Sequence, residues 1–314
     1  MLIFIILAPI FLLLLYFIVQ PQPVSIPIKG RHVFITGGSS GIGLALAHKA
    51  ISEGARVSLL ARSLSKLEEA KKSLHLAYGV DVGIFAADVR DYDAVKRAIV
   101  EAGPIDVLVV NQGIFVPQEL EKQDMDEVKL MIDVNLVGSF NVIKAALPLM
   151  KGRKDSRPAS IALMSSQAGQ VGIYGYSAYS ASKFGLRGLA EALQQELISD
   201  DIHISVIYPP DTETPGLEEE RKIRPKMTEM IAGSGSVLKA EEVAKKTLDG
   251  IKSGSFSISF RMEGKMLAIA TAGASPQRSF LIAFFEVVLA GISRIVTLLF
   301  LSNVYRSIRK SHAI

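Results

Sequence analysis

Residues 36–43 read TGGSSGIG, directly after the apolar run HVFIT at 32–36 and before a stretch that favours a helix. Glycines let the backbone turn tightly and approach a pyrophosphate closely. The N-terminus of the following helix offers unpaired N–H groups and the positive end of its dipole. Glycines also make ordinary turns. The predicted strand before the loop and the predicted helix after it are what favour a dinucleotide-binding loop over such a turn. The residues expected to cradle the cofactor are Gly37, Ser39, Ser40, Gly41 and Ile42.

On either side of this loop, short apolar runs alternate with amphipathic stretches from residue 32 to 260. Continuously apolar or β-branched runs are typical of strands that are covered on both faces. They lie at 32–36, 56–61, 82–86, 105–110, 159–164, 203–208 and 256–260. Segments between them, such as 64–76 and 94–101, have the apolar spacing of helices. The alternation predicts an α/β fold with a doubly wound, Rossmann-type parallel sheet of about seven strands.

The composition indicates a folded enzyme whose apolar residues are concentrated in part of the chain. Of its 314 residues, 21% are charged, near the ordinary value of about 25%. The mean hydropathy of +0.33 is nevertheless high for a soluble enzyme. A net charge of +4 is too small to indicate a nucleic-acid partner. Because the chain has no cysteine, disulfides and cysteine–zinc sites are excluded, and we expect no metal site.

Residues 2–19 form an unbroken apolar run that holds fifteen Leu, Ile, Val or Phe residues. At roughly −0.3 to −0.6 kcal/mol each, membrane insertion gains about 4 to 9 kcal/mol. A signal peptide is the alternative, but it has a basic segment before its apolar region, and this chain has none. We therefore predict a transmembrane anchor at 1–20 and an extended, proline-rich linker at 21–29. The basic residues Lys29, Arg31 and Lys49 follow the run, which places the next domain in the cytosol.

A second apolar segment, 280–301, also holds fifteen Leu, Ile, Val or Phe residues, but it includes Glu286 and Arg294. Two charges in mid-membrane cost about 5 to 7 kcal/mol, which cancels the gain from insertion. An interfacial or substrate-entrance helix is favoured over a second span, and both remain open. The basic tail is expected either to contact anionic headgroups or to be solvated. Its residues are Arg306, Arg309, Lys310 and His312. The chain then divides into a catalytic domain at 30–262 and an apolar extension at 263–314.

The end of the second predicted strand indicates which dinucleotide binds. NAD enzymes usually place an acid there for the ribose 2′-hydroxyl, whereas this chain has Ala61 followed by Arg62, with Lys66 one helical turn further on. A guanidinium pairs with a 2′-phosphate, so the sequence predicts NADPH. Asp88 and Val89 close the third strand. The Asp88 carboxylate is expected either to accept from the adenine amino group or to cap the next helix.

Tyr179 and Lys183 are four residues apart in a predicted helix, so the phenol and the ammonium share one face. A neighbouring ammonium favours the phenolate and is expected to lower the pKa of Tyr179 from its usual value of about 10. Such a pair is common by itself, but here Ser165 and Ser166 end the fifth predicted strand, thirteen residues before the tyrosine. Ligands of parallel sheets bind at the carboxyl ends of the strands, where these serines lie.

In these motifs the chain resembles the short-chain dehydrogenase/reductase family. TGxxxGxG, Asn-x-Gly at 111–113, Asn135, Ser166 and Tyr-x-x-x-Lys occur in the family's order over residues 30–260. The resemblance implies that Tyr179 protonates a substrate carbonyl oxygen as hydride arrives from the nicotinamide, and that Lys183 binds the nicotinamide ribose. It implies that Ser166 holds the carbonyl oxygen, with Ser165 as the alternative, and that Asn135 supports a water-linked proton path.

Two stretches depart from the family pattern. Gln112 stands where the family usually has alanine, and Pro210 stands where it usually has glycine. Because proline fixes φ and lacks an N–H group, the loop over the nicotinamide is expected to differ in shape. The resemblance still implies that Asn111 lies beside the cofactor ribose and that Thr214 binds the carboxamide.

Four stretches resemble the branch of the family that reduces a long-chain sphingoid ketone: 36–43, 165–170, 179–194 and 208–216. The resemblance implies an NADPH-dependent reductase at the cytosolic face of the endoplasmic reticulum membrane, with membrane lipids as partners. A lipid substrate also fits the apolar ends, since each buried CH₂ contributes about 0.8 kcal/mol to membrane binding.

Other functions remain open at this stage. One alternative is a membrane-anchored reductase of steroid, retinoid or fatty-acyl ketones, which would share the fold, the anchor and the Tyr/Lys pair. The other is a non-catalytic NADP(H)-binding sensor or scaffold, although such proteins typically lose the tyrosine or the lysine, and this chain has both. Family members often form homo-oligomers through helices like those expected at 125–150 and 176–198. The amphipathic faces of these helices could equally be buried against the chain's own sheet.

Overall fold

The computed structural model describes residues 2–20, 23–155, 157–232 and 237–311. Two residues of the predicted linker, Pro21 and Gln22, lie outside these ranges, as does His312 of the predicted basic tail.

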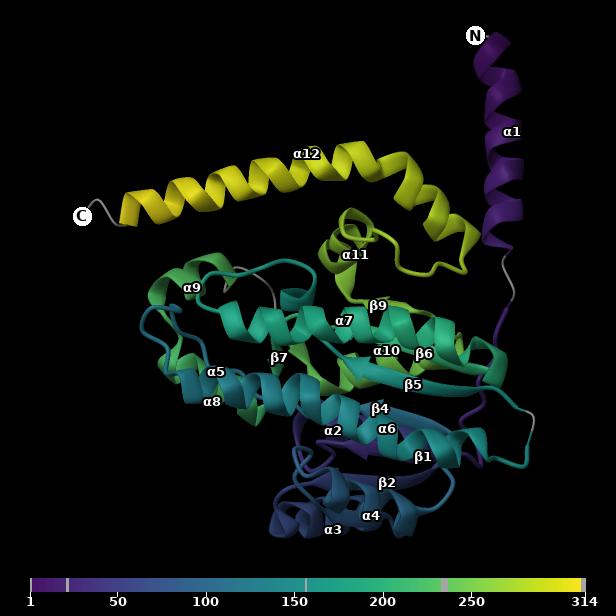
Figure 1. Ribbon diagram of the computed structural model, residues 1–314, viewed down its shortest axis with the longest axis vertical. Helices are drawn as coiled ribbons and strands as arrows, with labels where there is room; N and C mark the ends of the chain where they lie inside the picture. Colours follow the sequence, from purple (N-terminus) through teal and green to yellow (C-terminus); the bar gives the residue numbers. More distant parts are fainter. Residues whose placement is uncertain (1, 21–22, 156, 233–236, 312–314) are drawn as a thin grey trace.

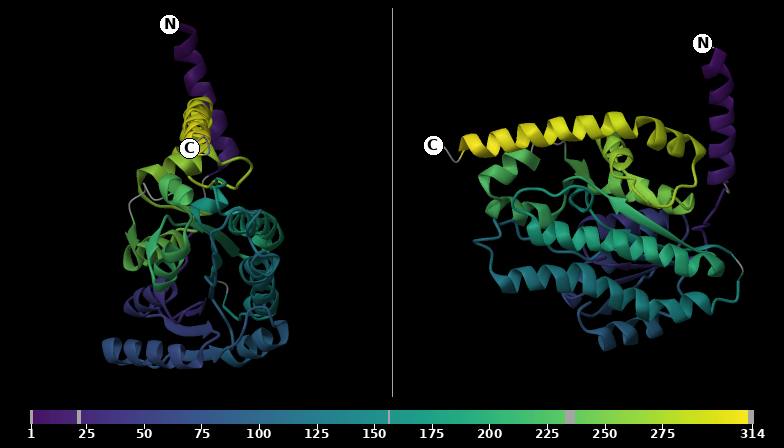
Figure 2. Two further views of the ribbon diagram at one scale, coloured as in Figure 1. Left: turned by 90° about the vertical axis from the view of Figure 1, so that its left-hand side faces the viewer. Right: turned by 45° about the horizontal axis from the view of Figure 1, so that its top comes forward.

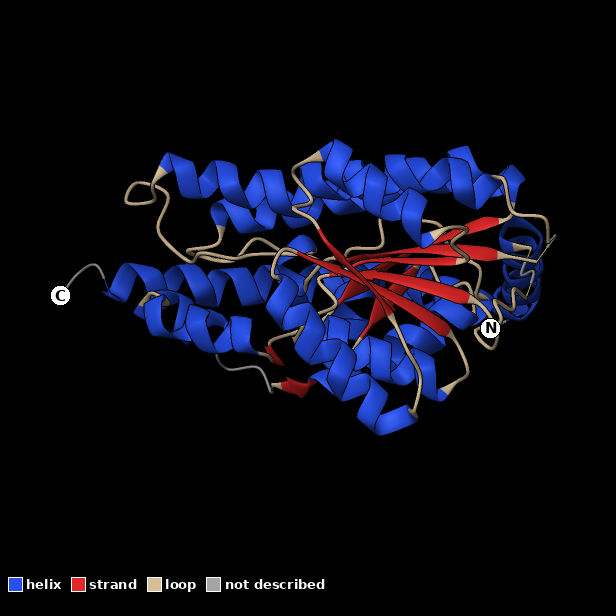
Figure 3. Ribbon diagram, turned by 90° about the horizontal axis from the view of Figure 1, so that it is seen from below, coloured by secondary structure: helices blue, strands red, loops and turns tan. Residues whose placement is uncertain are grey.

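The core of the protein is a sheet of seven parallel strands in the order β3-β2-β1-β4-β5-β6-β9. Figure 3 shows its twist, with helices on both sides. The strands are β1 (His32–Thr36), β2 (Arg56–Ala61), β3 (Gly83–Ala86), β4 (Val107–Val110), β5 (Ala159–Met164), β6 (Ile202–Tyr208) and β9 (Ser257–Ser259). The order reverses direction at β1, between β2 and β4, which creates the crevice where such sheets bind ligands. The predicted doubly wound parallel fold is confirmed.

Helices cover both faces of the sheet because its strands are apolar on both sides. One face carries α2 (Gly41–Ser52), α3 (Leu64–Tyr78) and α10 (Ala240–Lys252), whose apolar side chains form one core cluster with the strands. The other face carries α4 (Tyr92–Ala102), α6 (Gly138–Lys151) and α7 (Ser177–Leu197), which form the second cluster. This three-layer packing fixes the carboxyl ends of the strands as a rigid platform.

Several elements differ from the pattern expected from the sequence. The helix expected at 125–150 consists of α5 (Met125–Ile132) and α6, joined by a π-helical turn η1 (Asp133–Val137). A small second sheet pairs β7 (Thr212–Glu213) with β8 (Leu238–Lys239). Between these two strands lie α8 (Pro215–Ile223) and α9 (Lys226–Ala232). Strands of two residues are too short to leave an apolar pattern, so they were not expected.

Two apolar helices lie on the same side of the α/β domain (Figures 1 and 2). The first, α1 (Leu2–Val19), covers the predicted anchor segment, and the second, α12 (Phe280–Ser311), follows α11 (Arg261–Ala270). They touch where the ring of Phe11 lies 6.4 Å from that of Phe284 and the ring of Tyr16 lies 6.0 Å from that of Phe280. Arg306, Arg309 and Lys310 of the expected tail belong to the last turns of α12, where cations are favoured by the helix dipole.

Within the described residues, two helical stretches are long and apolar enough to cross a membrane: 125–151 and Phe280–Ser311. The first is half buried and belongs to the core of the α/β domain, whereas the apolar window of the second is not buried at all. In α12, Glu286 accepts a hydrogen bond from the Nε2 of Gln277 at 2.9 Å. The second apolar helix therefore carries a carboxylate that already has a partner within the protein.

Candidate active site

A cavity of about 1380 Å³ lies at the carboxyl ends of the central strands. It is lined by all the residues predicted to bind the cofactor and by four of the five predicted catalytic residues. The cofactor set comprises Gly37, Ser39, Ser40, Gly41, Ile42, Arg62, Lys66, Asp88, Val89, Asn111, Tyr179, Lys183 and Thr214. Residues that follow the five strands β1 to β5 and residues of the helices α2, α3 and α7 thus converge on one space.

The glycines of the loop stand where there is no room for a side chain. A Cβ on Gly43 would lie 2.2 Å from the carbonyl oxygen of Gly37, and Gly37 itself has a φ of +61°. Asn111 holds the loop from β4, since its Nδ2 donates to the oxygens of Thr36 and Gly37, each at 3.2 Å. A glycine-rich loop that leads into the N-terminus of α2 fits a dinucleotide pyrophosphate. Asn111 therefore shapes the phosphate loop as well as lining the cavity.

The adenosine end of the cavity is lined by Arg62 and Lys66, at the end of β2 and the start of α3. Asp88 lines it from the far side, and its carboxylate is held by Arg90 at 2.7 Å, which keeps the pKa of Asp88 below its usual range. The cap of α4 is Asp91, which accepts from the backbone N–H of Ala94 at 3.0 Å. The alternative that Asp88 caps this helix is therefore wrong.

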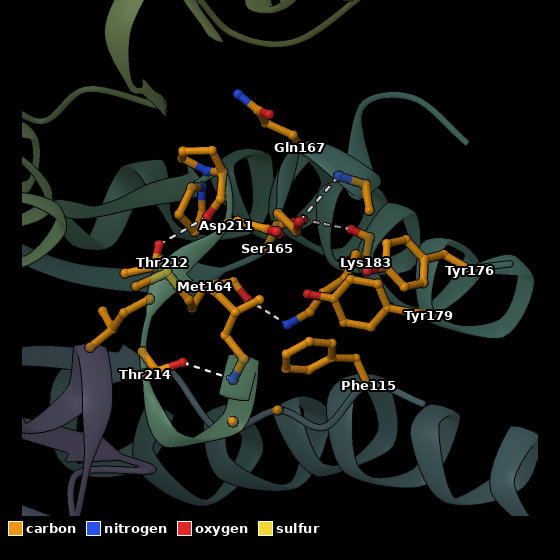
Figure 4. A pocket seen from close by; sticks show the side chains of 18 of the residues that line it. Phe115, Met164, Ser165, Gln167, Tyr176, Tyr179, Lys183, Asp211, Thr212 and Thr214 are labelled. Atoms are coloured by element: carbon orange, nitrogen blue, oxygen red, sulfur yellow. Dashed lines mark hydrogen bonds between the residues drawn. The ribbon is translucent and has the colours of Figure 1, made fainter. Parts of the chain in front are cut away.

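Tyr179 and Lys183 face the same part of the cavity from the first turns of α7 (Figure 4). The Nζ of Lys183 donates to the carbonyl oxygen of Met164 at 2.8 Å and lies 5.7 Å from the centre of the Tyr179 ring. The ring of Phe115 packs against that of Tyr179 at 5.5 Å. The hydrogen bond to the end of β5 fixes the amine beside the phenol.

The pKa values of this pair differ from the sequence-based expectation. Desolvation raises the pKa of Tyr179 to about 12, although its hydrogen bond with Ser166 acts in the opposite direction. Desolvation also lowers the pKa of Lys183 to about 8. The expected lowering of the Tyr179 pKa by Lys183 is not found, because loss of water disfavours the charged form of both groups. At neutral pH, Tyr179 is a protonated phenol, the form that can give a proton to a carbonyl.

The two serines at the end of β5 have different partners. Ser165 is buried, and its hydroxyl donates to the carbonyl oxygen of Lys183 at 2.9 Å. The hydroxyl of Ser166 accepts from the N–H of Ala168 at 3.1 Å, which leaves its own proton available, and it lies within hydrogen-bonding reach of Tyr179. The geometry favours Ser166 as the partner of a substrate carbonyl.

Asn135 is the predicted catalytic residue that does not line the cavity. It lies in the π-helical turn, fully buried, with both ends of its amide in use. Its Oδ1 accepts from the N–H of Ile114 at 2.8 Å, and its Nδ2 donates to Ser182 at 3.0 Å. The side chain therefore ties the end of β4 to α7 from behind the cavity wall.

Some lining residues were not singled out from the sequence. Phe115 and Tyr176 stack near Tyr179, and Asp211 lines the cavity from the loop that follows β6. The departure at Pro210 pointed to the loop that holds Asp211, and the position of Tyr176 three residues before Tyr179 is a signal that was not used. The residue types themselves carried no signal, since phenylalanine, tyrosine and aspartate occur in most loops.

The C-terminal extension covers the part of the cavity away from Arg62 and Lys66. Helix α11 contributes Met266, Leu267 and Ala270, and helix α12 contributes an apolar row four residues apart. That row consists of Val296, Phe300 and Val304. An apolar helix that is otherwise exposed therefore forms part of the wall of the catalytic cavity.

The fold and this constellation define a reductase of one family. The family model for short chain dehydrogenases matches residues 31–224, and the chain belongs to the short-chain dehydrogenase/reductase family. It is 65% identical to a 3-dehydrosphinganine reductase of Arabidopsis thaliana, over 93% of this chain and 90% of that protein. It is 39% identical to a 3-dehydrosphinganine reductase of Danio rerio, over 96% and 92% of the two chains.

Solved structures share the fold. A short-chain dehydrogenase/reductase of Burkholderia phymatum in complex with NAD superposes with a TM-score of 0.66 at 24% identity, covering 74% of this chain and 89% of that one. Membership of the family and the tightly packed glycines of the loop together identify the cavity as a nicotinamide dinucleotide site.

Proposed function

We propose that this protein reduces 3-dehydrosphinganine (3-ketodihydrosphingosine) to dihydrosphingosine with NADPH. The observation that carries the proposal is a single cavity that runs from Tyr179 to the apolar row on α12. A polar ketone end and a long alkyl tail need such a combination. The names of the relatives in Arabidopsis thaliana and Danio rerio give the same substrate.

The residues of the site account for the reduction. The nicotinamide, when bound, supplies the hydride that adds to the carbonyl carbon. Tyr179 gives its proton to the carbonyl oxygen, so that the ketone becomes an alcohol. Ser166 donates a hydrogen bond to the same oxygen beforehand and orients it. The ammonium of Lys183 stabilises the phenolate that remains, and Asn135 holds β4 and α7 in register behind the pair.

The preference for NADPH is supported by the charge at the end of β2. Arg62 and Lys66 line the adenosine end of the cavity, and the position where NAD enzymes carry an acid is Ala61. A guanidinium and an ammonium attract a 2′-phosphate there.

We further propose that the protein works at the cytosolic face of the endoplasmic reticulum membrane. The support is the pair of apolar helices α1 and α12 on one side of the domain (Figure 1). Lys29 and Lys49 follow α1, as the cytosolic side requires. Arg31 is buried and pairs with Asp155 at 2.7 Å. Its charge therefore stabilises the fold and does not contribute to the orientation of α1 in the membrane.

A panel of ketones tests the proposed substrate. The purified full-length protein in detergent or vesicles receives NADPH with 3-dehydrosphinganine, a steroid ketone or a retinoid ketone. We expect kcat/KM for the sphingoid ketone to exceed both others by more than tenfold. A higher value for the steroid or the retinoid would assign the site to another lipid, and no turnover of any ketone would favour a binding protein.

A further inference from the structure

Asp211 occupies a fixed position at the edge of the catalytic cavity. It follows Pro209 and Pro210 at the end of β6 and lines the cavity together with Ser166 and Tyr179. Its backbone oxygen accepts from the N–H of Leu238 at 3.0 Å, which anchors it to the small β7–β8 sheet. Figure 4 shows Asp211 across the cavity from Tyr179 and Lys183. The loop therefore presents a carboxylate directly after Pro210, the position where the family usually has glycine.

The surroundings of Asp211 leave an excess of negative charge. Arg224 pairs with Asp211 at 2.9 Å, with Glu220 at 2.6 Å and with Glu229 at 3.2 Å, so three carboxylates share one guanidinium. The side chains of Arg224 and Glu220 are 1% exposed, whereas that of Asp211 is 29% exposed. Arg224 contacts Oδ2 of Asp211, and within the described part of the chain Oδ1 has no hydrogen-bond partner. A held carboxylate with one open oxygen suits a cationic ligand.

This carboxylate is connected to the reacting groups on two sides. The N–H of Gln167 donates to the oxygen of Pro209 at 3.2 Å, which ties the Asp211 loop to the segment that carries Ser166. On the other side, the hydroxyl of Tyr176 donates to Glu220 at 2.8 Å, and its ring packs edge-on against that of Tyr179 at 5.6 Å. The distance between Asp211 and the reacting groups is therefore set by packed, hydrogen-bonded neighbours.

We propose that Asp211 binds the ammonium group at carbon 2 of the substrate and so selects an amino ketone over a plain ketone. The inference rests on the proposed function, because the sphingoid ketone carries its amine on the carbon next to the carbonyl. Ser166 and Tyr179 hold the carbonyl oxygen, and Asp211 holds the neighbouring cation from the same cavity. Asp211 acts on specificity, since it neither gives nor takes a proton in the reduction.

The test uses two substrates of equal chain length, 3-dehydrosphinganine and the 1-hydroxy-3-ketone that lacks the amine. For Asp211→Asn, we expect kcat/KM for the amino ketone to fall about 10- to 100-fold, as the loss of a charged hydrogen bond predicts, and kcat/KM for the amine-free ketone to change less than about threefold. Asp211→Glu should recover part of the loss. The matched control is Glu213→Gln, which removes an exposed carboxylate two residues away that does not line the cavity.

Equal losses on both substrates, or no loss on the amino ketone, would overturn the role of Asp211 while leaving the proposed function intact. Failure of the wild-type protein to reduce the amino ketone would instead overturn the proposed function, and the role of Asp211 with it. A further arm needs no variant: acetylating the substrate amine should lower wild-type kcat/KM more than tenfold, and an unchanged value would contradict the inference. Thermal unfolding of Asp211→Asn shows whether the loop is intact, since Arg224 keeps Glu220 and Glu229 as partners.

Discussion

Tyr179 has a phenol whose pKa is raised to about 12 by desolvation, so it is protonated over the whole physiological range. Replacing Tyr179 by Phe removes the proton donor but keeps the ring that packs against Phe115. We expect kcat to fall about 10²- to 10⁴-fold, the usual contribution of a general acid. NADPH affinity, measured by cofactor fluorescence, should change less than about threefold. Retained turnover would refute the assignment of the proton to Tyr179.

Lys183 is the group that we expect to make the reduction depend on pH. Its pKa is lowered to about 8 by desolvation, so the amine is charged at neutral pH and loses its charge as the pH rises above 8. The charged form is the one that stabilises the phenolate, and we therefore expect kcat/KM for reduction to be constant near pH 7 and to decline above about pH 8. The amine-free ketone is the proper substrate, because only enzyme groups then titrate. A profile that stays flat to pH 10 would exclude this role.

We propose that Arg62 sets the preference for NADPH over NADH. The change Arg62→Ala removes a guanidinium from the adenosine end of the cavity. We expect KM for NADPH to rise about 10- to 100-fold, in line with a charge-assisted hydrogen bond, and KM for NADH to change little. Steady-state kinetics with both cofactors measures the difference. An equal rise of KM for NADPH and of KM for NADH would show that Arg62 supports the fold of the site and does not bind the 2′-phosphate.

At the level of single residues, spacing in the sequence was enough to bring the catalytic groups together. Tyr179 and Lys183 share a face because four residues make about one helical turn. Ser166 lies near them because it stands at the end of a strand, and parallel strands end at one edge of the sheet. Burial depends on the whole fold, so the direction of the Tyr179 pKa shift was predicted wrongly. The bonding partners of Asp88 and Asn135 could not be predicted either. Arg90 and Ile114 meet these side chains through the geometry of the folded chain, which leaves no pattern in the sequence.

Helix α12 is the element that we propose adapts the domain to a long substrate. The change Val296→Asp places a charge on the apolar row that lines the cavity. We expect KM for the long-chain ketone to rise about tenfold, as lost burial of a few methylenes predicts, with little change for a short water-soluble ketone. Ile295→Asp is the matched control, since Ile295 is 60% exposed and does not line the cavity. Equal effects of the two variants on the long-chain ketone would argue against α12 as a wall of the tail site.

The elements themselves differ in how far they could be predicted. Strands β1, β2 and β5 begin and end where their apolar runs do, because strands covered on both faces leave an uninterrupted apolar signal. The π-helical turn at Asp133–Val137 left no such signal, since it changes hydrogen bonding and not composition. The apolar character of α12 was evident, but its place over the cavity depends on how α11 directs the chain.

On the scale of the whole molecule, the two apolar helices lie on one side of the α/β domain (Figure 2), and α12 lines the cavity. The high mean hydropathy of the chain resides in these helices, while the domain itself has the burial pattern of an ordinary reductase. Packing against a second copy through α6 and α7 remains a prediction.

The most direct test of the account uses NADPH that carries deuterium at the transferred position, with the full-length protein and 3-dehydrosphinganine in phospholipid vesicles. Mass spectrometry then follows the product. We predict dihydrosphingosine with one deuterium at carbon 3, formed by the wild-type protein and absent with Tyr179→Phe. Failure to form dihydrosphingosine, or formation of product without the label, would contradict the central claim that this site transfers a hydride to the sphingoid ketone.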